Sequence, residues 1–136
     1  MKKKIKITNT RRYTKEKNIQ YNGYVDINET MDGFMFTFRE KDNTKVRMNV
    51  HDYYMQIERF GQATTFLTLR KDVTTKNPIK SPYGVFEIDI FTYDYQNRGN
   101  YIKVEYDVEN GTDDKDGFIV EIEIKEGRNE FHWKKS

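Results

Sequence analysis

The chain alternates apolar and polar residues with a period of two along most of its length, and this feature most limits its fold. Residues 46–50 and 102–108 are clear examples, with an apolar side chain at every second position. Successive side chains of a β-strand point to opposite faces, so the pattern predicts strands with one buried and one solvated face. The composition agrees, because Val, Ile, Phe, Tyr, Thr and Trp total 53 of 136 residues, whereas Ala and Leu total three. We therefore predict an all-β protein and exclude a helical bundle.

Eight to ten such segments follow one another, and most are separated by short turns such as residues 40–44 and 97–100. Residues 71–83 contain both prolines and predict the longest irregular connection. Short connections favour antiparallel neighbours, and a sheet with one dry face and no covering helices closes on itself. We predict a single antiparallel up-and-down barrel of eight to ten strands that takes residues 1–136 as one domain. A two-sheet sandwich is the alternative.

Composition excludes several classes of protein and of chemistry. The chain has no Cys, which excludes disulfides, thiolate zinc sites and cysteine nucleophiles. Lysines interrupt the apolar residues at the start of the chain, so no signal peptide is predicted. No apolar run approaches the roughly 18 residues that span a bilayer. We expect a cytoplasmic protein without membrane association.

Three segments resemble the YwiB-like family of small bacterial proteins of unknown function. They are residues 53–61 with 64–66, residues 81–88, and residues 101–108 with the acidic, glycine-containing loop that follows. The resemblance covers residues 46–125 and implies a calycin-type, lipocalin-like barrel; it supplies no catalytic residues. Residues 76–80 depart from the family pattern, because Pro78 stands where a regular strand would run. An extra edge or a bulge is expected there.

One loop carries the spacing of a calcium site. Counted from Thr112, Asp114 and Asp116 fall at the third and fifth ligand positions and Glu123 at the twelfth. The first position is Thr instead of Asp, and residues 118–125 alternate as a strand, which turns Glu123 away from the loop. We interpret the loop as a solvated turn and expect no metal.

Candidate catalytic groups are equally sparse. His51 beside Asp52 has the residue types of an oriented base, but the pair lies in a predicted turn, where exposed polar residues are ordinary. The two serines, Ser81 and Ser136, lie in no nucleophile pattern, and no glycine-rich phosphate loop is present. We expect no catalytic residues, no cofactor and no enzymatic activity.

The predicted barrel interior offers a different function, the binding of a small apolar or amphipathic ligand. An eight-stranded barrel is about wide enough to be filled by side chains or to hold one small ligand. Alternation directs Tyr21, Thr65, Thr92 and Tyr106 inward, and it places Arg59 at a barrel mouth, where a guanidinium would meet a carboxylate ligand. An ordinary filled core is the open alternative, because the predicted inward set is large: Phe34, Phe36, Phe38, Met48, Met55, Leu67, Phe86, Ile88, Ile90, Val104, Tyr106, Phe118, Val120 and Ile122.

The uneven charge of the chain supports an alternative function. Residues 1–17 contain eight Lys or Arg and one Glu, whereas residues 87–130 contain thirteen acids and five bases. Residues 11–17 and 131–135 mix cations with aromatic rings, a combination with which proteins bind single-stranded nucleic acids. The alternative is therefore a nucleic-acid-associated or surface-interaction protein that uses its basic termini. Lysines that protect an edge strand are the simpler explanation of the first segment, because it is short and apolar residues interrupt it at strand spacing. The sequence leaves the oligomeric state open.

Overall fold

The computed structural model describes residues 1–109 and 116–125, and within them it contains β-strands and no helix. The strands are β1 (Lys2–Arg11), β2 (Lys17–Asp26), β3 (Asn28–Thr30), β4 (Gly33–Arg39), β5 (Lys45–His51), β6 (Tyr54–Phe60), β7 (Thr64–Arg70), β8 (Thr74–Ser81), β9 (Gly84–Asn97), β10 (Tyr101–Glu109) and β11 (Asp116–Lys125). The predicted all-β class is confirmed, with eleven strands in place of eight to ten. Nothing in the described part of the chain forms a long apolar helix of the kind that crosses a membrane.

The strands form one antiparallel sheet that nearly closes into a barrel. From β3 to β11 each strand pairs with the next in the chain, and β1 pairs with both β11 and β2. The sheet ends at β2 and β3, and Ile27 alone connects these two strands. The backbone of Ile27 exchanges two hydrogen bonds with Met1, with N···O distances of 2.7 and 3.2 Å. The predicted up-and-down barrel is confirmed, with its seam between β2 and β3.

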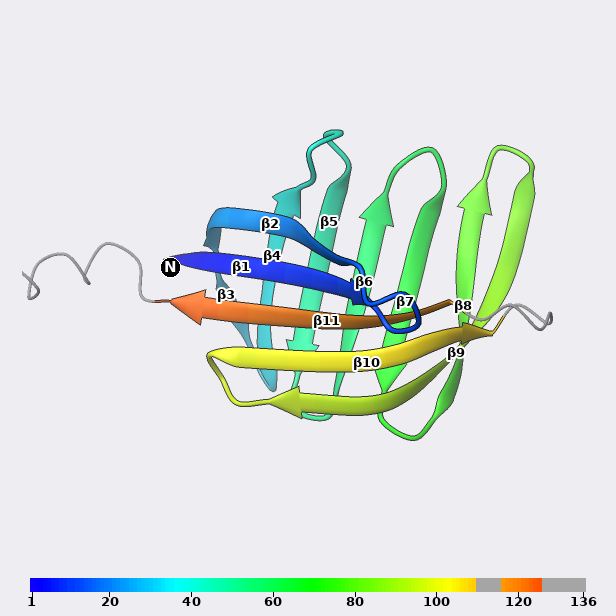
Figure 1. Cartoon of the computed structure of the whole chain (residues 1–136). Coiled ribbons are helices and arrows are strands. Elements are labelled where there is room, and N and C mark those ends of the chain that lie inside the picture. The colour runs from blue at the N-terminus through cyan, green and yellow to red at the C-terminus, as the bar shows by residue number, and fades with distance from the viewer. Residues whose placement is uncertain (110–115, 126–136) are drawn as a thin grey trace, which may run out of the picture.

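The core lies between two parts of this sheet. In Figure 1, β1, β2, β10 and β11 run across the front of the barrel, and β4 to β7 run behind them at a steep inclination. All of the large side chains predicted to point inward, except Phe86, belong to the core or pack against it. Its fully buried members come from both parts and include Ile5, Ile7, Phe36, Met48, Met55, Leu69, Ile90, Ile102 and Ile122.

The irregular connection predicted over residues 71–83 is wrong, because β8 occupies most of it and pairs along its length with β9. Against β7, however, β8 pairs at only two positions. The buried side chain of Asn77 replaces the missing ladder: it accepts a hydrogen bond from the Thr68 amide at 2.7 Å and donates one to the Ile88 carbonyl at 3.3 Å. Pro78, which has no N–H to donate, follows at this interruption. The extra edge expected near Pro78 is therefore present, because this part of β8 pairs with β9 but not with β7.

Phe86 is the exception among these large side chains, and it is 55% exposed. It belongs to the first part of β9, which pairs with β8 alone, because β10 joins β9 only from Asp89 onward. The β8–β9 hairpin extends beyond the strands that cover the core, and Tyr83 and Val85 at its end are exposed as well. Alternation gives the face of a residue on its strand but not whether another layer covers that face.

Candidate functional site

The barrel holds a cavity of about 360 Å³ that opens at the end where the β4–β5 and β6–β7 turns lie. Ligand pockets begin at about 300 Å³, so the cavity is large enough for one small molecule. Its apolar lining comes from both parts of the sheet: Met48, Ile57, Leu67, Ile88, Ile90, Val108, Phe118 and Val120. Its polar lining consists of Asn9, Asn18, Gln20, Glu40, Arg59, Thr65 and Tyr106. The interior is therefore not completely filled by side chains.

Four of these polar residues, Gln20, Glu40, Arg59 and Thr65, are called the mouth residues below. Arg59 on β6 lies opposite Thr65 on β7 and opposite the fully buried Val46 on β5, which places all three on the inner face. The Arg59 Nη2 donates to Glu40 Oε1, and the Gln20 Nε2 donates to Glu40 Oε2 at 2.9 Å. Glu40 thereby connects β6 to β2 across the opening.

Two polar atoms of the mouth residues have no hydrogen-bond partner. They are the Nε of Arg59 and the Oγ1 of Thr65, and both are shielded from water. A buried polar group without a partner costs about 1–3 kcal/mol, so such groups are few in folded proteins and call for an explanation. Both atoms belong to side chains that line the cavity. A small rotation of either side chain toward an oxygen atom in the cavity would satisfy it.

Tyr106 forms part of the cavity wall and is only 6% exposed. Burial raises the pKa of its phenol to about 12, and the positive charge of Arg59 opposes this increase. The phenol is therefore neutral at pH 7. It adds a hydroxyl group, and no charge, to the lining.

The structure brings together three of the five residues predicted to bind a ligand: Arg59, Thr65 and Tyr106 line the cavity. Tyr21 does not line it; its ring packs on Phe38 at 4.9 Å, and its hydroxyl donates to a backbone carbonyl. Thr92 is completely buried away from the cavity, and its hydroxyl has no partner.

Sequence reasoning missed Gln20, Glu40, Asn9 and Asn18. The ladder between β1 and β2 shifts after Ile7, which leaves Gln20 without a paired residue. This bulge reverses the alternation, so Gln20 and Asn18 face the cavity while the intervening Ile19 is 47% exposed. Glu40 directly follows β4 and belongs to residues 40–44, which the sequence predicts as a turn. No signal in the alternation marks either position.

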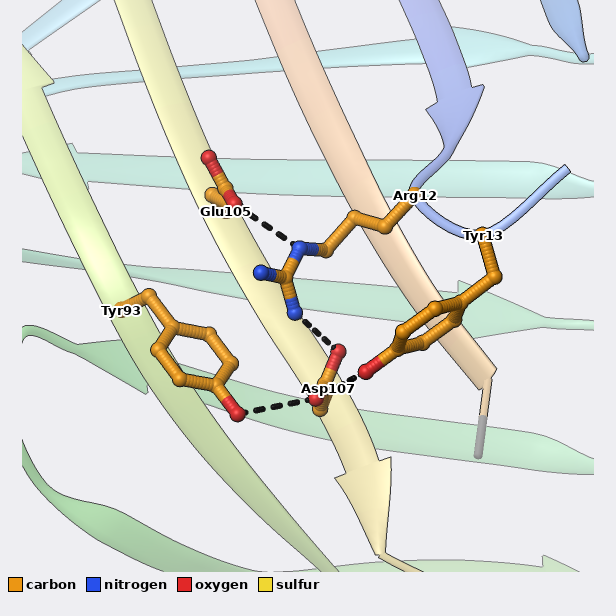
Figure 2. A network of polar contacts seen from close by, with 5 residues as sticks. All are labelled: Arg12, Tyr13, Tyr93, Glu105 and Asp107. Carbon is orange, nitrogen blue, oxygen red and sulfur yellow. Dashed lines mark hydrogen bonds and ion pairs between the residues drawn. The ribbon is translucent and has the colours of Figure 1, made fainter. Parts of the chain in front are cut away.

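A second polar cluster lies on the outer face of the barrel, where the β1–β2 turn meets β9 and β10 (Figure 2). We call it the Asp107 network. The Arg12 Nη1 donates to Asp107 Oδ1 at 2.5 Å, and the Arg12 Nε donates to Glu105 at 2.8 Å. The hydroxyls of Tyr13 and Tyr93 donate to Asp107 Oδ2 at 2.7 and 2.9 Å. The guanidinium also lies 4.3 Å from the centre of the Tyr93 ring.

Asp107 is the centre of this network and is 1% exposed. Burial alone would raise the pKa of its carboxyl group, but hydrogen bonds from Tyr13, Arg12 and Tyr93, with the charge of Arg12, hold that pKa below 3.8. A β-carbon at Gly117 would lie 2.2 Å from Asp107 Oδ1, so only glycine fits beside the carboxylate. The network is closed and saturated, which fits a structural role.

The Asp107 network bears on the alternative function. Arg12 and Tyr13, two residues of the predicted basic and aromatic segment, are committed to contacts within the molecule. Residues 131–135, the second such segment, lie outside the described residues. Binding of nucleic acid stays a prediction.

The candidate catalytic and metal groups do not form a site in the described residues. The Nδ1 of His51 lies 2.9 Å from Asp32, not Asp52, and its ring stacks on Tyr54 at 4.3 Å. Within residues 1–109 and 116–125 no three His, Asp or Glu side chains gather as a metal would require. Most of the predicted calcium-like loop, with Thr112 and Asp114, lies outside the described residues.

Comparison with known proteins agrees with the fold. Residues 5–122 match the family model described as Domain of unknown function (DUF1934). Among solved structures, the crystal structure of ywiB protein from Bacillus subtilis is similar, with a TM-score of 0.73 over 93% of this chain and 92% of that chain, at 12% sequence identity. No curated protein matches the sequence. The resemblance to the YwiB-like family is confirmed, and at this identity it concerns the fold alone.

Proposed function

The chain belongs to the family described as Domain of unknown function (DUF1934), and from the cavity itself we propose that it binds a small apolar or amphipathic molecule inside the barrel. The observation that carries this proposal is the 360 Å³ cavity, whose lining combines eight apolar residues with seven polar ones, among them the four mouth residues. A molecule with an apolar body and a polar end matches this distribution. Calycin-type barrels offer an analogy of fold, which does not determine function.

The expected affinity follows from the lining. Each methylene that leaves water for an apolar wall gains about 0.8 kcal/mol, and the loss of translational and rotational freedom offsets part of the total. Eight to ten carbon atoms gain about 6–8 kcal/mol in total, so after this offset we expect dissociation constants on the order of millimolar.

We propose binding without catalysis. Among the described residues, Glu40 is the one carboxylate that lines the cavity, and it accepts hydrogen bonds from both Arg59 and Gln20. Both oxygens of this carboxylate are therefore already engaged with donors of the protein. His51, the one histidine within the described residues, does not line the cavity.

The proposal is tested with N-phenyl-1-naphthylamine, an uncharged dye whose fluorescence increases in apolar surroundings. The protein is expected to bind one dye molecule in a saturable manner. Leu67→Trp, which fills the cavity from β7, removes this binding, whereas the volume-conserving Leu67→Met retains it. Val108→Phe fills the same space from β10 and serves as an independent variant if Leu67→Trp does not fold.

Circular dichroism and thermal unfolding show which variants keep the wild-type fold. Absence of saturable binding to the wild-type protein contradicts the proposal. Undiminished binding by a folded Leu67→Trp or Val108→Phe variant contradicts it as well, because the dye would then lie elsewhere, for example on the exposed apolar residues of the β8–β9 hairpin.

A further inference from the structure

We infer that the polar end of the ligand is uncharged and carries an oxygen that accepts hydrogen bonds, as in an amide, ester or ketone. This inference rests on the proposed function and specifies the chemical class of ligand. It replaces the carboxylate expected from Arg59 alone. The decisive feature is the ion pair between Arg59 and Glu40, which places a negative charge against the guanidinium before any ligand arrives.

The charges that line the cavity cancel. Glu40 and Arg59 are its only charged lining residues among those described, and they carry opposite signs. Just outside, Lys41 and Asp42 lie beside the same pair and again contribute one charge of each sign. A carboxylate at the mouth would approach the guanidinium and Glu40 together. Its attraction to one would be offset by its repulsion from the other, while its hydration would still be lost.

The remaining polar lining is uncharged. Asn9, Asn18 and Gln20 present amides, and Thr65 and Tyr106 present hydroxyls. Hydrogen bonds from amides and hydroxyls replace the water lost by a neutral polar group well, but they offset the much larger cost of desolvating a full charge poorly. The lining can therefore form hydrogen bonds with a neutral head group but offers no uncompensated charge to a charged one.

The unpaired atoms of the mouth residues indicate which partner is missing. The Arg59 Nε is a donor only, and the Thr65 hydroxyl can donate. They belong to residues that lie directly opposite each other on β6 and β7. After a small rotation of the two side chains, one carbonyl oxygen in the cavity would accept hydrogen bonds from both the Arg59 Nε and the Thr65 hydroxyl. A protonated ligand amine has no acceptor to offer and would leave the Arg59 Nε without a partner.

The test compares three ligands that share an eight-carbon skeleton and differ in the charge of the head group. Octanamide, octanoate and octylammonium compete at pH 7 with N-phenyl-1-naphthylamine for the wild-type protein. We expect octanamide to compete about tenfold more strongly than either charged ligand. Equal or stronger competition by octanoate or octylammonium would overturn the inference.

Variants of the ion pair make the test independent of the ligands' intrinsic hydrophobicity. Glu40→Gln leaves Arg59 without its counter-charge, so octanoate affinity is expected to rise about tenfold while octanamide affinity changes little. Arg59→Gln leaves Glu40 alone and is expected to favour octylammonium. The double variant restores a neutral mouth and with it the preference for octanamide. A selectivity that is the same in all four proteins contradicts the inference.

The two proposals fail in different ways. If dye binding responds to Leu67→Trp but octanamide does not compete, the neutral head group is wrong and the interior site stands. If the dye itself does not bind in the cavity, the proposed function fails and the inference falls with it.

Discussion

The mouth residues and the Asp107 network are built from the same parts but differ in completeness. Each centres on an arginine and a carboxylate, and each includes the unpaired residue of a β-bulge, Gln20 at the mouth and Tyr93 in the network. Asp107 is 1% exposed and receives three hydrogen bonds from side chains, whereas the Arg59 side chain is 43% exposed and its Nε has no partner. The Asp107 network stabilises the fold, whereas the mouth residues leave hydrogen-bonding atoms available to a ligand.

Truncation of the two carboxylates should separate these roles most clearly. Asp107→Ala leaves the mostly buried Arg12 and two tyrosine hydroxyls without their acceptor and should lower the free energy of unfolding by about 3–5 kcal/mol. Glu40→Ala breaks a pair whose arginine is partly solvated and should cost about 1 kcal/mol or less. Urea denaturation measures both. Equal losses would contradict the division between a structural and a binding cluster.

Gly117 provides a second, smaller test of how tightly the Asp107 network is packed. Gly117→Ala places a β-carbon 2.2 Å from Asp107 Oδ1 and should cost about 1–3 kcal/mol. Gly61→Ala is the matched control, because its nearest neighbour would lie at 3.5 Å, an ordinary contact. The loss at Gly117 should shrink in an Asp107→Ala background, since the closest of its contacts is removed. A loss at Gly117 no larger than that at Gly61 would count against close packing.

The pH dependence of stability tests the charge of Asp107. Its pKa in the folded protein is below the ordinary value of 3.8, so its contribution to stability is complete above that value and is lost as the pH falls through the folded pKa. The difference in unfolding free energy between wild type and Asp107→Asn should be constant from about pH 7 to about pH 5 and narrow in more acidic solution. A difference that widens as the pH falls below 3.8 would contradict a lowered pKa.

The smallest expected effects come from two threonines with unpaired, shielded hydroxyls. Thr65→Val and Thr92→Val each replace an unpaired hydroxyl by a methyl group and should change the unfolding free energy by less than about 1 kcal/mol. Only Thr65 lines the cavity. Octanamide affinity should therefore fall about three- to tenfold in Thr65→Val and stay unchanged in Thr92→Val. Competition with the dye measures this contrast, and equal affinities of the two variants would argue against a role for Thr65.

Much of the fold could be predicted from the alternation of residues. The strands around Met48, Met55, Val104 and Ile122 have one apolar face, and those side chains are buried. A nearly closed sheet follows, because no other element covers that face. The strand that contains Pro78 was missed, since its regularity depends on a side-chain substitute for the ladder, the hydrogen bond from the Thr68 amide to Asn77.

The candidate site was predictable only in part, for a physical reason. Arg59, Thr65 and Tyr106 lie on regular strands, where alternation correctly gives the inner face. Gln20 enters the cavity through a bulge and Glu40 from the start of a turn, and both features depend on the register between paired strands, which alternation does not give. The charge of Glu40 changes the expected ligand, so the missing residues altered the chemistry of the predicted site.

The most direct test of the interior site is an NMR measurement of nuclear Overhauser effects between octanamide and protein methyl groups. We predict contacts to the methyl groups of Ile57, Leu67 and Ile88, which line the cavity, and none to the equally apolar Val50 and Ile102, which are buried elsewhere. Contacts confined to the exposed Val85 on the β8–β9 hairpin would contradict the account, because the ligand would then bind outside the barrel.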